Sequence, residues 1–161
     1  MFECGGRYRR EKLLEFCGSR QTQVGIIWGD AEPGCVICTS GGKHKSKSGY
    51  ADEPLPDGSF RYFGQGTKGD QDAGKFANQL LIGGERTVLL FLSHEPTHAE
   101  AKQRGTHAKE YEFAGTFSVG AYEEFVPETG TRKGDRLLRF HLVRSGSLSL
   151  DDSTIEADFE P

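Results

Sequence analysis

The feature that most constrains the fold is a succession of short apolar stretches separated by turns rich in glycine and proline. The chain has 161 residues, of which 35% are hydrophobic, and it contains 22 glycines. This composition suits a β-rich domain with long loops better than a helical bundle, and the length suits one domain with one core. The sequence therefore predicts a single, mostly antiparallel α+β domain.

Several stretches have the apolar patterns of strands, and few have those of helices. The run 87–92 (TVLLFL) is almost continuously apolar, which is typical of a central strand covered on both faces. Residues 111–119 alternate between apolar and polar, as a strand with one buried face does. Further strands are expected at 24–28, 35–39, 59–63, 122–126 and 136–143. With two or three short helices, at 9–17 and 75–82 among others, these strands are expected to form a PUA-like barrel.

Charge is distributed unevenly along the chain. The formal net charge is −4, but the last fifteen residues, 147–161, carry five acids and no base. The rest of the chain is therefore close to neutral, and any contact with nucleic acid must come from a local cationic patch. We expect a folded domain at 1–146, followed by an acidic flexible tail or linker at 147–161.

Two patterns resemble metal sites. Cys35 and Cys38 form a C-x-x-C pair, but they lie in an expected strand, where residues three apart point to opposite faces. His94 and His98 are four apart in the polar stretch 93–109, which is expected to be an exposed loop, with Pro96 between them. We therefore expect reduced thiols, exposed histidines and no metal.

The sequence has none of the motifs that usually mark catalysis or export. It lacks a nucleophile elbow, a P-loop, a dinucleotide fingerprint and the zinc-deaminase pattern. No apolar run reaches the length of a membrane span, and the first residues do not form a secretory signal. The expectation is a binding module with no catalytic residues and no cofactor. We expect no membrane contact, and a cytoplasmic, nucleoid-associated location.

The stretch 40–81 carries the candidate site. Tyr50 and Tyr62 are twelve positions apart, and Asp52 and Glu53 lie between them. Two aromatic faces and an acid that accepts from an exocyclic amine would suit a pocket for a planar base. Tyrosine-rich strands joined by Pro/Gly turns are also ordinary β structure, so composition alone leaves both interpretations open.

The same stretch resembles a known family. Residues 49–53 (GYADE) followed by 57–66 (DGSFRYFGQG) are similar to the YDG signature of SRA (SET- and RING-associated) domains. That signature reads G-Y-E-D-D, then G-x-F-x-Y-T-G-x-G, with the same tyrosine spacing. The positions of Asp70 and Asn78 are similar to those in SRA-like domains that precede HNH nucleases in bacterial modification-dependent restriction enzymes.

The resemblance implies a PUA-like domain that binds duplex DNA carrying 5-methylcytosine or 5-hydroxymethylcytosine and flips the modified base. Tyr50 and Tyr62 would sandwich the flipped ring. Glu53 aligns with the family acid that receives the cytosine amine, and Asp52 is the other candidate. Phe63 stands where the family has a threonine beside the methyl group, which leaves the identity of the modification open.

Further residues are expected to contact DNA or to shape the pocket loop. The expected DNA contacts are Arg20, Gln21, Gln23, Lys43, Lys45, Lys47 and Lys68. A glycine-rich loop follows at 64–74, and the residues expected to shape it are Gly64, Gly66, Asp70 and Asn78.

The expected partners are double-stranded DNA with modified cytosine and a fused or associated HNH-type nuclease; the oligomeric state is not predicted. Two alternatives stay open at this point. One is a glycosylase-like hydrolase that uses Asp52 or Glu53 on the flipped base. The other is an RNA-binding module on the same type of barrel.

Replacing Lys43, Lys45 and Lys47 together by alanine should weaken binding to modified and unmodified DNA alike, because phosphate contacts carry no sequence information. The log–log dependence of affinity on salt should become shallower by up to about three units. Binding titrations over a range of salt concentrations measure this slope. An unchanged slope would show that the run is a solvated segment.

Overall fold

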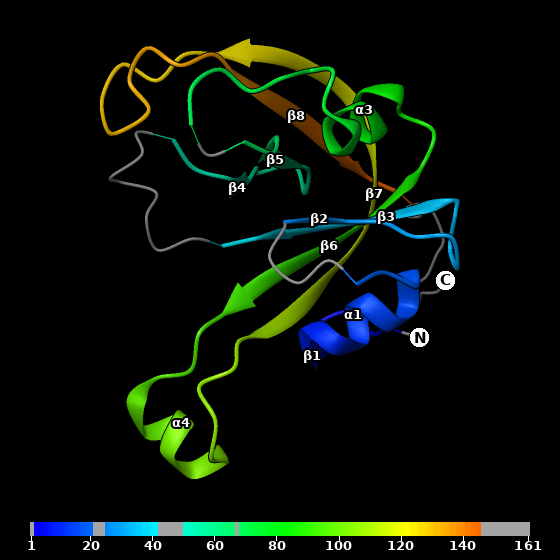
Figure 1. The fold of residues 1–161 in the computed structure, drawn as a ribbon, viewed down its shortest axis with the longest axis vertical. Coiled ribbons are helices and arrows are strands. Elements are labelled where there is room, and N and C mark those ends of the chain that lie inside the picture. The colour runs from blue at the N-terminus through cyan, green and yellow to red at the C-terminus, as the bar shows by residue number, and fades with distance from the viewer. Residues whose placement is uncertain (1, 21–24, 42–49, 67, 146–161) are drawn as a thin grey trace.

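The structure is a computed structural model that describes residues 2–20, 25–41, 50–66 and 68–145. Its strands form one eight-stranded sheet in the order β2-β3-β6-β7-β8-β5-β4, with β1 paired to β7 (Figure 1). The strands are β1 Arg7–Tyr8, β2 Ile26–Ile27, β3 Cys35–Ser40, β4 Glu53–Pro54, β5 Phe60–Phe63, β6 Thr87–His94, β7 Glu110–Phe125 and β8 Leu137–Arg144. The helices are α1 Arg10–Cys17, α3 Phe76–Gly83 and α4 His98–Arg104.

The predicted α+β class with a mostly antiparallel sheet is confirmed. Among the described strands, β3 and β6 alone pair in parallel, and the other pairs are antiparallel. The strands expected at 111–119 and 122–126 are one long strand, β7, whose pairing with β8 shifts register between Val119 and Ala121. Gly120 at this irregularity breaks the alternation, and the sequence pattern therefore looked like two strands.

The predicted closure of the sheet into a barrel is wrong for the described strands. The sheet has two ends, at β2 and at β4, and they are not paired with each other. Each end strand has only two residues, and Pro54 in β4 has no backbone N–H to donate. Too few backbone groups are available for a closing ladder, so the sheet curls but stays open.

The apolar core lies on both faces of the parallel pair. Val88 and Leu90 of β6 pack in a cluster beneath α3, whereas Leu89 and Phe91 pack in a second cluster beneath α1. Figure 1 shows the two helices on opposite sides of these strands. The expectation that 87–92 is a strand covered on both faces is confirmed.

The two cysteines of the C-x-x-C pair point to opposite faces, as expected. Cys38 packs in the cluster beneath α3, and Cys35 packs against the cluster beneath α1. Burial raises the pKa of the Cys38 thiol, and burial also raises that of Cys17 to about 11. These thiols are therefore protonated near neutral pH and behave as small apolar side chains.

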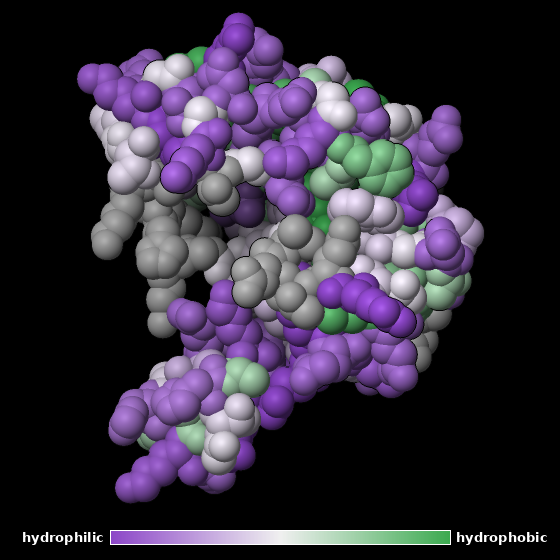
Figure 2. Space-filling model, viewed as in Figure 1, coloured by the Kyte–Doolittle hydropathy of each residue, from purple (hydrophilic) through white to green (hydrophobic). Residues whose placement is uncertain are grey.

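An arm leaves the body where β6 runs into α4 and returns as β7 (Figures 1 and 2). The arm corrects the expectation of a loop at 93–109. Thr97 and Glu100 form a capping box that starts α4 directly after Pro96. His98 therefore begins a helix, and His94 on β6 lies with its Nε2 2.9 Å from Glu112 Oε1.

No described helix is long and apolar enough to cross a membrane.

Asn78 on α3 holds the start of the glycine-rich loop. Its side chain is fully buried; Oδ1 accepts a hydrogen bond from the Gln65 amide at 2.8 Å. Its Nδ2 donates to the carbonyls of Gln65 at 3.1 Å and Asp72 at 2.9 Å. Three backbone groups of the loop thus find their partner in one side chain.

The Asn78→Ala variant should lose about 1–3 kcal/mol of unfolding free energy for each of these backbone groups that is left buried and unpaired. Urea unfolding measures the loss. Gln79→Ala, at an exposed position of the same helix, is the matched control and should be near neutral. Equal unfolding free energies for the two variants would show that the loop does not depend on Asn78.

Candidate functional site

The two ends of the open sheet are tied together by the Tyr62 side chain. Tyr62 lies on β5, and its hydroxyl donates to the Thr39 carbonyl on β3 at 3.1 Å. The same hydroxyl lies 3.4 Å from the Gly25 carbonyl, just before β2. The tyrosine is 3% exposed and belongs to the cluster beneath α3. Burial raises the pKa of its phenol, which keeps the hydroxyl a donor.

Asp52 makes a second tie, just before β4. Its Oδ2 accepts from the Ser40 hydroxyl at the end of β3 at 2.8 Å, and its Oδ1 accepts from the Phe63 amide on β5 at 2.8 Å. Hydrogen bonds to a carboxylate are among the stronger ones in proteins, and two of them fix its orientation. We call this junction of the sheet's ends, made by Thr39, Ser40, Asp52, Tyr62 and Phe63, the seam.

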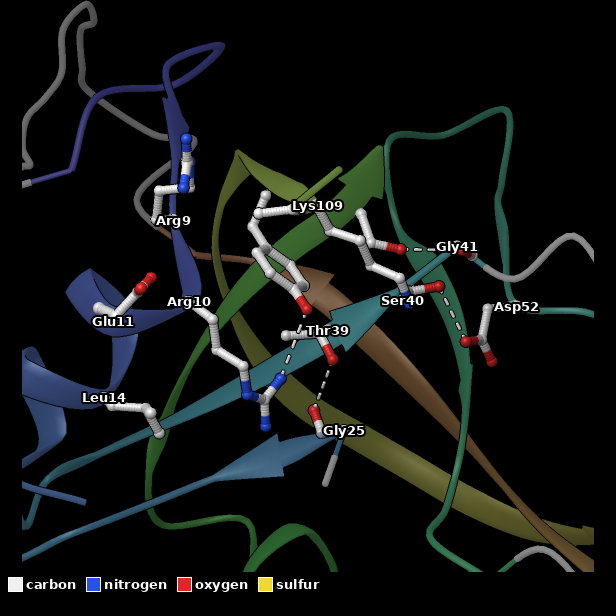
Figure 3. A pocket seen from close by; sticks show the side chains of 13 residues that line it. Arg9, Arg10, Glu11, Leu14, Gly25, Thr39, Ser40, Gly41, Asp52 and Lys109 are labelled. Atoms are coloured by element: carbon white, nitrogen blue, oxygen red, sulfur yellow. Dashed lines mark hydrogen bonds between the residues drawn. The ribbon is translucent and has the colours of Figure 1, made fainter. Parts of the chain in front are cut away.

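A cavity of about 820 Å³ opens beside the seam (Figure 3). One wall is the seam itself, with Thr39, Ser40 and Asp52. The opposite wall comes from α1 and from the start of β7. The remaining lining residues are Arg9, Arg10, Glu11, Leu14, Gly25, Gly41, Ser93, Ala108, Lys109 and Tyr111. This volume is in the range of pockets that enclose small organic ligands.

Of the two candidate acids, the structure brings Asp52 to the cavity. Glu53 lies on the edge strand β4, opposite Arg61 of β5, and its Oε1 is 2.8 Å from Arg61 Nη1. The Glu53 side chain is 47% exposed, and Glu53 does not belong to the cavity wall. Glu53 therefore stabilises the edge of the sheet, whereas Asp52 presents a fixed carboxylate to the cavity.

The predicted aromatic pair is placed differently from a simple sandwich. The Tyr50 ring packs on Phe63, with centroids 4.6 Å apart and an interplanar angle of 57°. Phe63 in turn packs edge-on against Phe125. Tyr50 is half-buried, and burial raises the pKa of its phenol. The structure thus brings Tyr50 together with Phe63, and it places the Tyr62 ring inside the core behind the seam.

Arg132 is a central residue that sequence reasoning missed. The arginine is 6% exposed; its Nη1 and Nη2 donate to the carbonyls of Gly66 at 3.0 Å and Gly69 at 2.7 Å. Its Nε donates to Asp135 at 2.7 Å, and its guanidinium lies near enough to Tyr50 to lower the pKa of that phenol against the effect of burial. Arg132 therefore positions the glycine-rich loop and lies near the aromatic ring. An arginine in a polar turn, far along the chain from its partners, gives no local sequence signal.

The other predicted loop residues lie where they can shape this loop. A Cβ at Gly64 would come within 2.8 Å of Asn78 Oδ1, and Gly66 has a φ of 138°. The Asp70 carboxylate accepts from the Arg136 amide at 2.8 Å and from its guanidinium at 3.1 Å. The Arg136 backbone and side-chain donors lower the pKa of Asp70.

The predicted DNA contacts are only partly described. Arg20 and Lys68 are both exposed. Gln21, Gln23, Lys43, Lys45 and Lys47 lie outside the described residues. Along the chain they adjoin Gly25 and Gly41, which line the cavity. Among the described residues, no group of three or more His, Cys, Asp or Glu side chains is arranged to hold a metal.

Comparisons with known proteins give one family and several solved structures. Residues 4–100 match the family described as ScoMcrA-like, SRA domain. The MspJI restriction endonuclease, in complex with a 27-mer oligonucleotide, is 18% identical with a TM-score of 0.54. KRYPTONITE, in complex with mCHG DNA and SAH, is 14% identical with a TM-score of 0.59. The sulfur-binding and SRA domains of ScoMcrA, complexed with phosphorothioated DNA, are 18% identical with a TM-score of 0.58.

The chain spans less than half of each of these solved chains. The matches cover 78%, 94% and 99% of this chain, but 34%, 34% and 44% of the MspJI, KRYPTONITE and ScoMcrA chains. At these identities the likeness establishes a shared fold. A comparison with curated proteins gave no significant match.

Removing the two hydrogen bonds from Arg132 to the carbonyls of Gly66 and Gly69, here called the Arg132 clamp, should destabilise the glycine-rich loop. In Arg132→Ala the carbonyls of Gly66 and Gly69 lose their donor, at a cost of about 1–3 kcal/mol for each group that stays buried. Hydrogen exchange of the loop amides and urea unfolding measure the effect, with the exposed Lys133→Ala as control. Unchanged protection of the loop in Arg132→Ala would contradict the clamp.

Proposed function

The chain belongs to the ScoMcrA-like SRA domain family, and from this premise we propose that it binds duplex DNA carrying a modified cytosine and holds the flipped base in the cavity beside the seam. SRA domains are DNA-recognition modules, so the proposed role is binding without catalysis. The solved relatives include complexes with methylated and with phosphorothioated DNA. The proposal for this chain specifies the base, 5-methylcytosine or 5-hydroxymethylcytosine, and the residue that receives it.

The observation that carries the proposal is the fixed carboxylate of Asp52 at the cavity wall. An ionised carboxylate only accepts hydrogen bonds, and its two oxygens have about four acceptor positions. Cytosine presents an amino group on its pairing edge, where thymine presents a carbonyl oxygen. Asp52 would therefore attract a flipped cytosine and repel a flipped thymine.

Flipping costs a few kcal/mol of free energy, because the base loses its stacking and its pairing, and contacts in the pocket must offset this cost. Stacking on an aromatic side chain contributes roughly 1–3 kcal/mol per base. Tyr50, half-buried and packed on Phe63, is the predicted stacking partner, and neither of these two rings belongs to the cavity lining. The Tyr62 ring packs in the core. The sandwich of the base between Tyr50 and Tyr62 stays a prediction.

Discrimination between modifications would come from shape. One methyl group in a close-fitting pocket contributes about 1–3 kcal/mol, so modest preferences are expected. By the family resemblance, Phe63 stands where a threonine lies beside the 5-substituent, and its larger side chain would limit the size of that substituent. Binding titrations with matched duplexes that carry cytosine, 5-methylcytosine, 5-hydroxymethylcytosine or its glucosylated form would rank these preferences.

Cleavage, in this proposal, belongs to another domain. The solved neighbours include modification-dependent restriction endonucleases, of which this chain matches a part. We propose an HNH-type nuclease, fused to or associated with this domain, as the partner that cuts. Such a system would act on DNA in the cytoplasm, at the nucleoid.

The two candidate acids provide the sharpest test. Asp52→Asn should weaken binding to the modified duplex by about tenfold to a hundredfold, because the charge-assisted hydrogen bond to the amino group of the flipped cytosine is lost. Glu53→Gln should leave this affinity near its original value, since Glu53 pairs with Arg61 at the sheet edge. Equilibrium binding to the modified duplex, with thermal unfolding as a folding control, measures the two effects. If Glu53→Gln weakens binding instead, the acid is assigned to the wrong residue.

Flipping is tested separately from binding. A 2-aminopurine placed beside the modified base should brighten on binding, because extrusion unstacks it. A probe that stays dark while the modified duplex is bound tightly would contradict flipping. Formation of abasic sites would favour the hydrolase, and stronger competition by RNA than by duplex would favour the RNA-binding alternative.

A further inference from the structure

The wall of the cavity opposite the seam carries positive charge. Arg9, Arg10 and Lys109 line it, against one acid, Glu11. Figure 3 shows Arg10 extending from α1 toward Thr39, with Asp52 at the other side of the view. The cavity thus has a carboxylate on one wall and guanidinium and ammonium groups on the other.

The neighbouring acids Glu110 and Glu112 do not pair with Arg9 or Lys109. Glu110 and Glu112, which flank Tyr111 on β7, are engaged elsewhere. Glu110 pairs with Arg104 at 2.8 Å, and Glu112 Oε1 lies 2.9 Å from His94 Nε2. None of the ion pairs between described residues involves Arg9 or Lys109, and both side chains are exposed.

Arg10 lies in the cavity beside Tyr111. It is only partly exposed, and its Nη1 lies 3.5 Å from the hydroxyl of Tyr111, which is itself 7% exposed. A guanidinium presents a planar set of donors that matches two oxygens of a phosphate, and orienting it in advance reduces the entropy lost on binding. Arg10 is therefore suited to a phosphate group that enters the cavity.

We propose that Arg9, Arg10 and Lys109 bind the backbone phosphates next to the flipped nucleotide, so that the cavity holds a nucleotide at both of its ends. This inference rests on the proposed function, which places the base at Asp52. A nucleotide carries its amino group and its phosphate at opposite ends, and the two walls have the matching charges. The α1 wall would then fix the register of the modified strand, and Asp52 would select the base.

The test combines variants of the full chain with neutralised phosphates in the DNA. The variants are Arg10→Lys and the double replacement Arg9→Ala with Lys109→Ala. Lys12→Ala is the matched control, because Lys12 lies on the same helix, pairs with Glu15 at 3.7 Å and does not line the cavity. The probes are a duplex with one 5-methylcytosine and the same duplex with a neutral methylphosphonate on either side of that nucleotide.

We expect Arg10→Lys to weaken binding to the methylated duplex about tenfold, the loss typical of one charge-assisted hydrogen bond. The double variant should reduce the log–log salt slope by about two units. One of the methylphosphonates should weaken DNA binding by the unaltered protein by a similar factor. The same methylphosphonate should have little further effect on DNA binding by Arg10→Lys. This loss of additivity identifies the phosphate that Arg10 contacts.

The outcomes separate this inference from the proposed function. Full affinity of the unaltered protein for both methylphosphonate duplexes would overturn the inference, and this test needs no protein variant. Tight binding of the methylated duplex that depends on Asp52 would leave the proposed function standing in that case. A salt slope that falls without any position-specific methylphosphonate effect would make the wall a general backbone contact and would also overturn the nucleotide assignment. Absence of any preference for methylated duplex would overturn both.

Discussion

The hydrogen bonds that Tyr62 and Asp52 make across the seam are the constraint on which the site depends. A complete backbone ladder would bring the end strands to a spacing of about 4.8 Å and fill the junction with paired amides. Here the end strands β2 and β4 are two residues long, and side chains join their neighbours instead. The junction is closed at a few atoms only, which leaves the adjoining space to a cavity whose wall contains an oriented carboxylate.

The parts of the fold that the sequence predicted are those with a local signal. The apolar run of β6 and the opposite-facing Cys35 and Cys38 follow from the two-residue period of a strand. Barrel closure failed as a prediction because it depends on whether two short strands, distant in sequence, find each other. The contact of Arg132 with the glycine-rich loop was not predicted for the same reason. Gly66 is far from Arg132 along the chain, and nothing near Arg132 in the sequence indicates the contact.

Which of Asp52 and Glu53 faces the seam depends on the strand register, and the sequence alone does not show that register. Adjacent side chains of an extended chain point to opposite sides, so only one of these acids can face the seam. The motif spacing could not decide between them. The pairing of Glu53 with Arg61 decides it, because it turns Glu53 outward with Arg61 and leaves Asp52 beside Phe63. The same alternation on β5 turns Phe60 and Tyr62 inward, and Tyr62 is therefore a core residue with a hydroxyl at the seam.

A junction made of side chains also differs from a ladder in how it opens. Each hydrogen bond of the seam contributes about 0.5–1.5 kcal/mol net, somewhat more where a carboxylate takes part. Separating the ends therefore costs a few such bonds and leaves the backbone pairs of β3 with β6 and of β5 with β8 intact. A cytosine amine that reaches Asp52 would replace part of what is lost. The seam thus connects two frames of paired strands, β3 with β6 and β5 with β8, through side-chain hydrogen bonds.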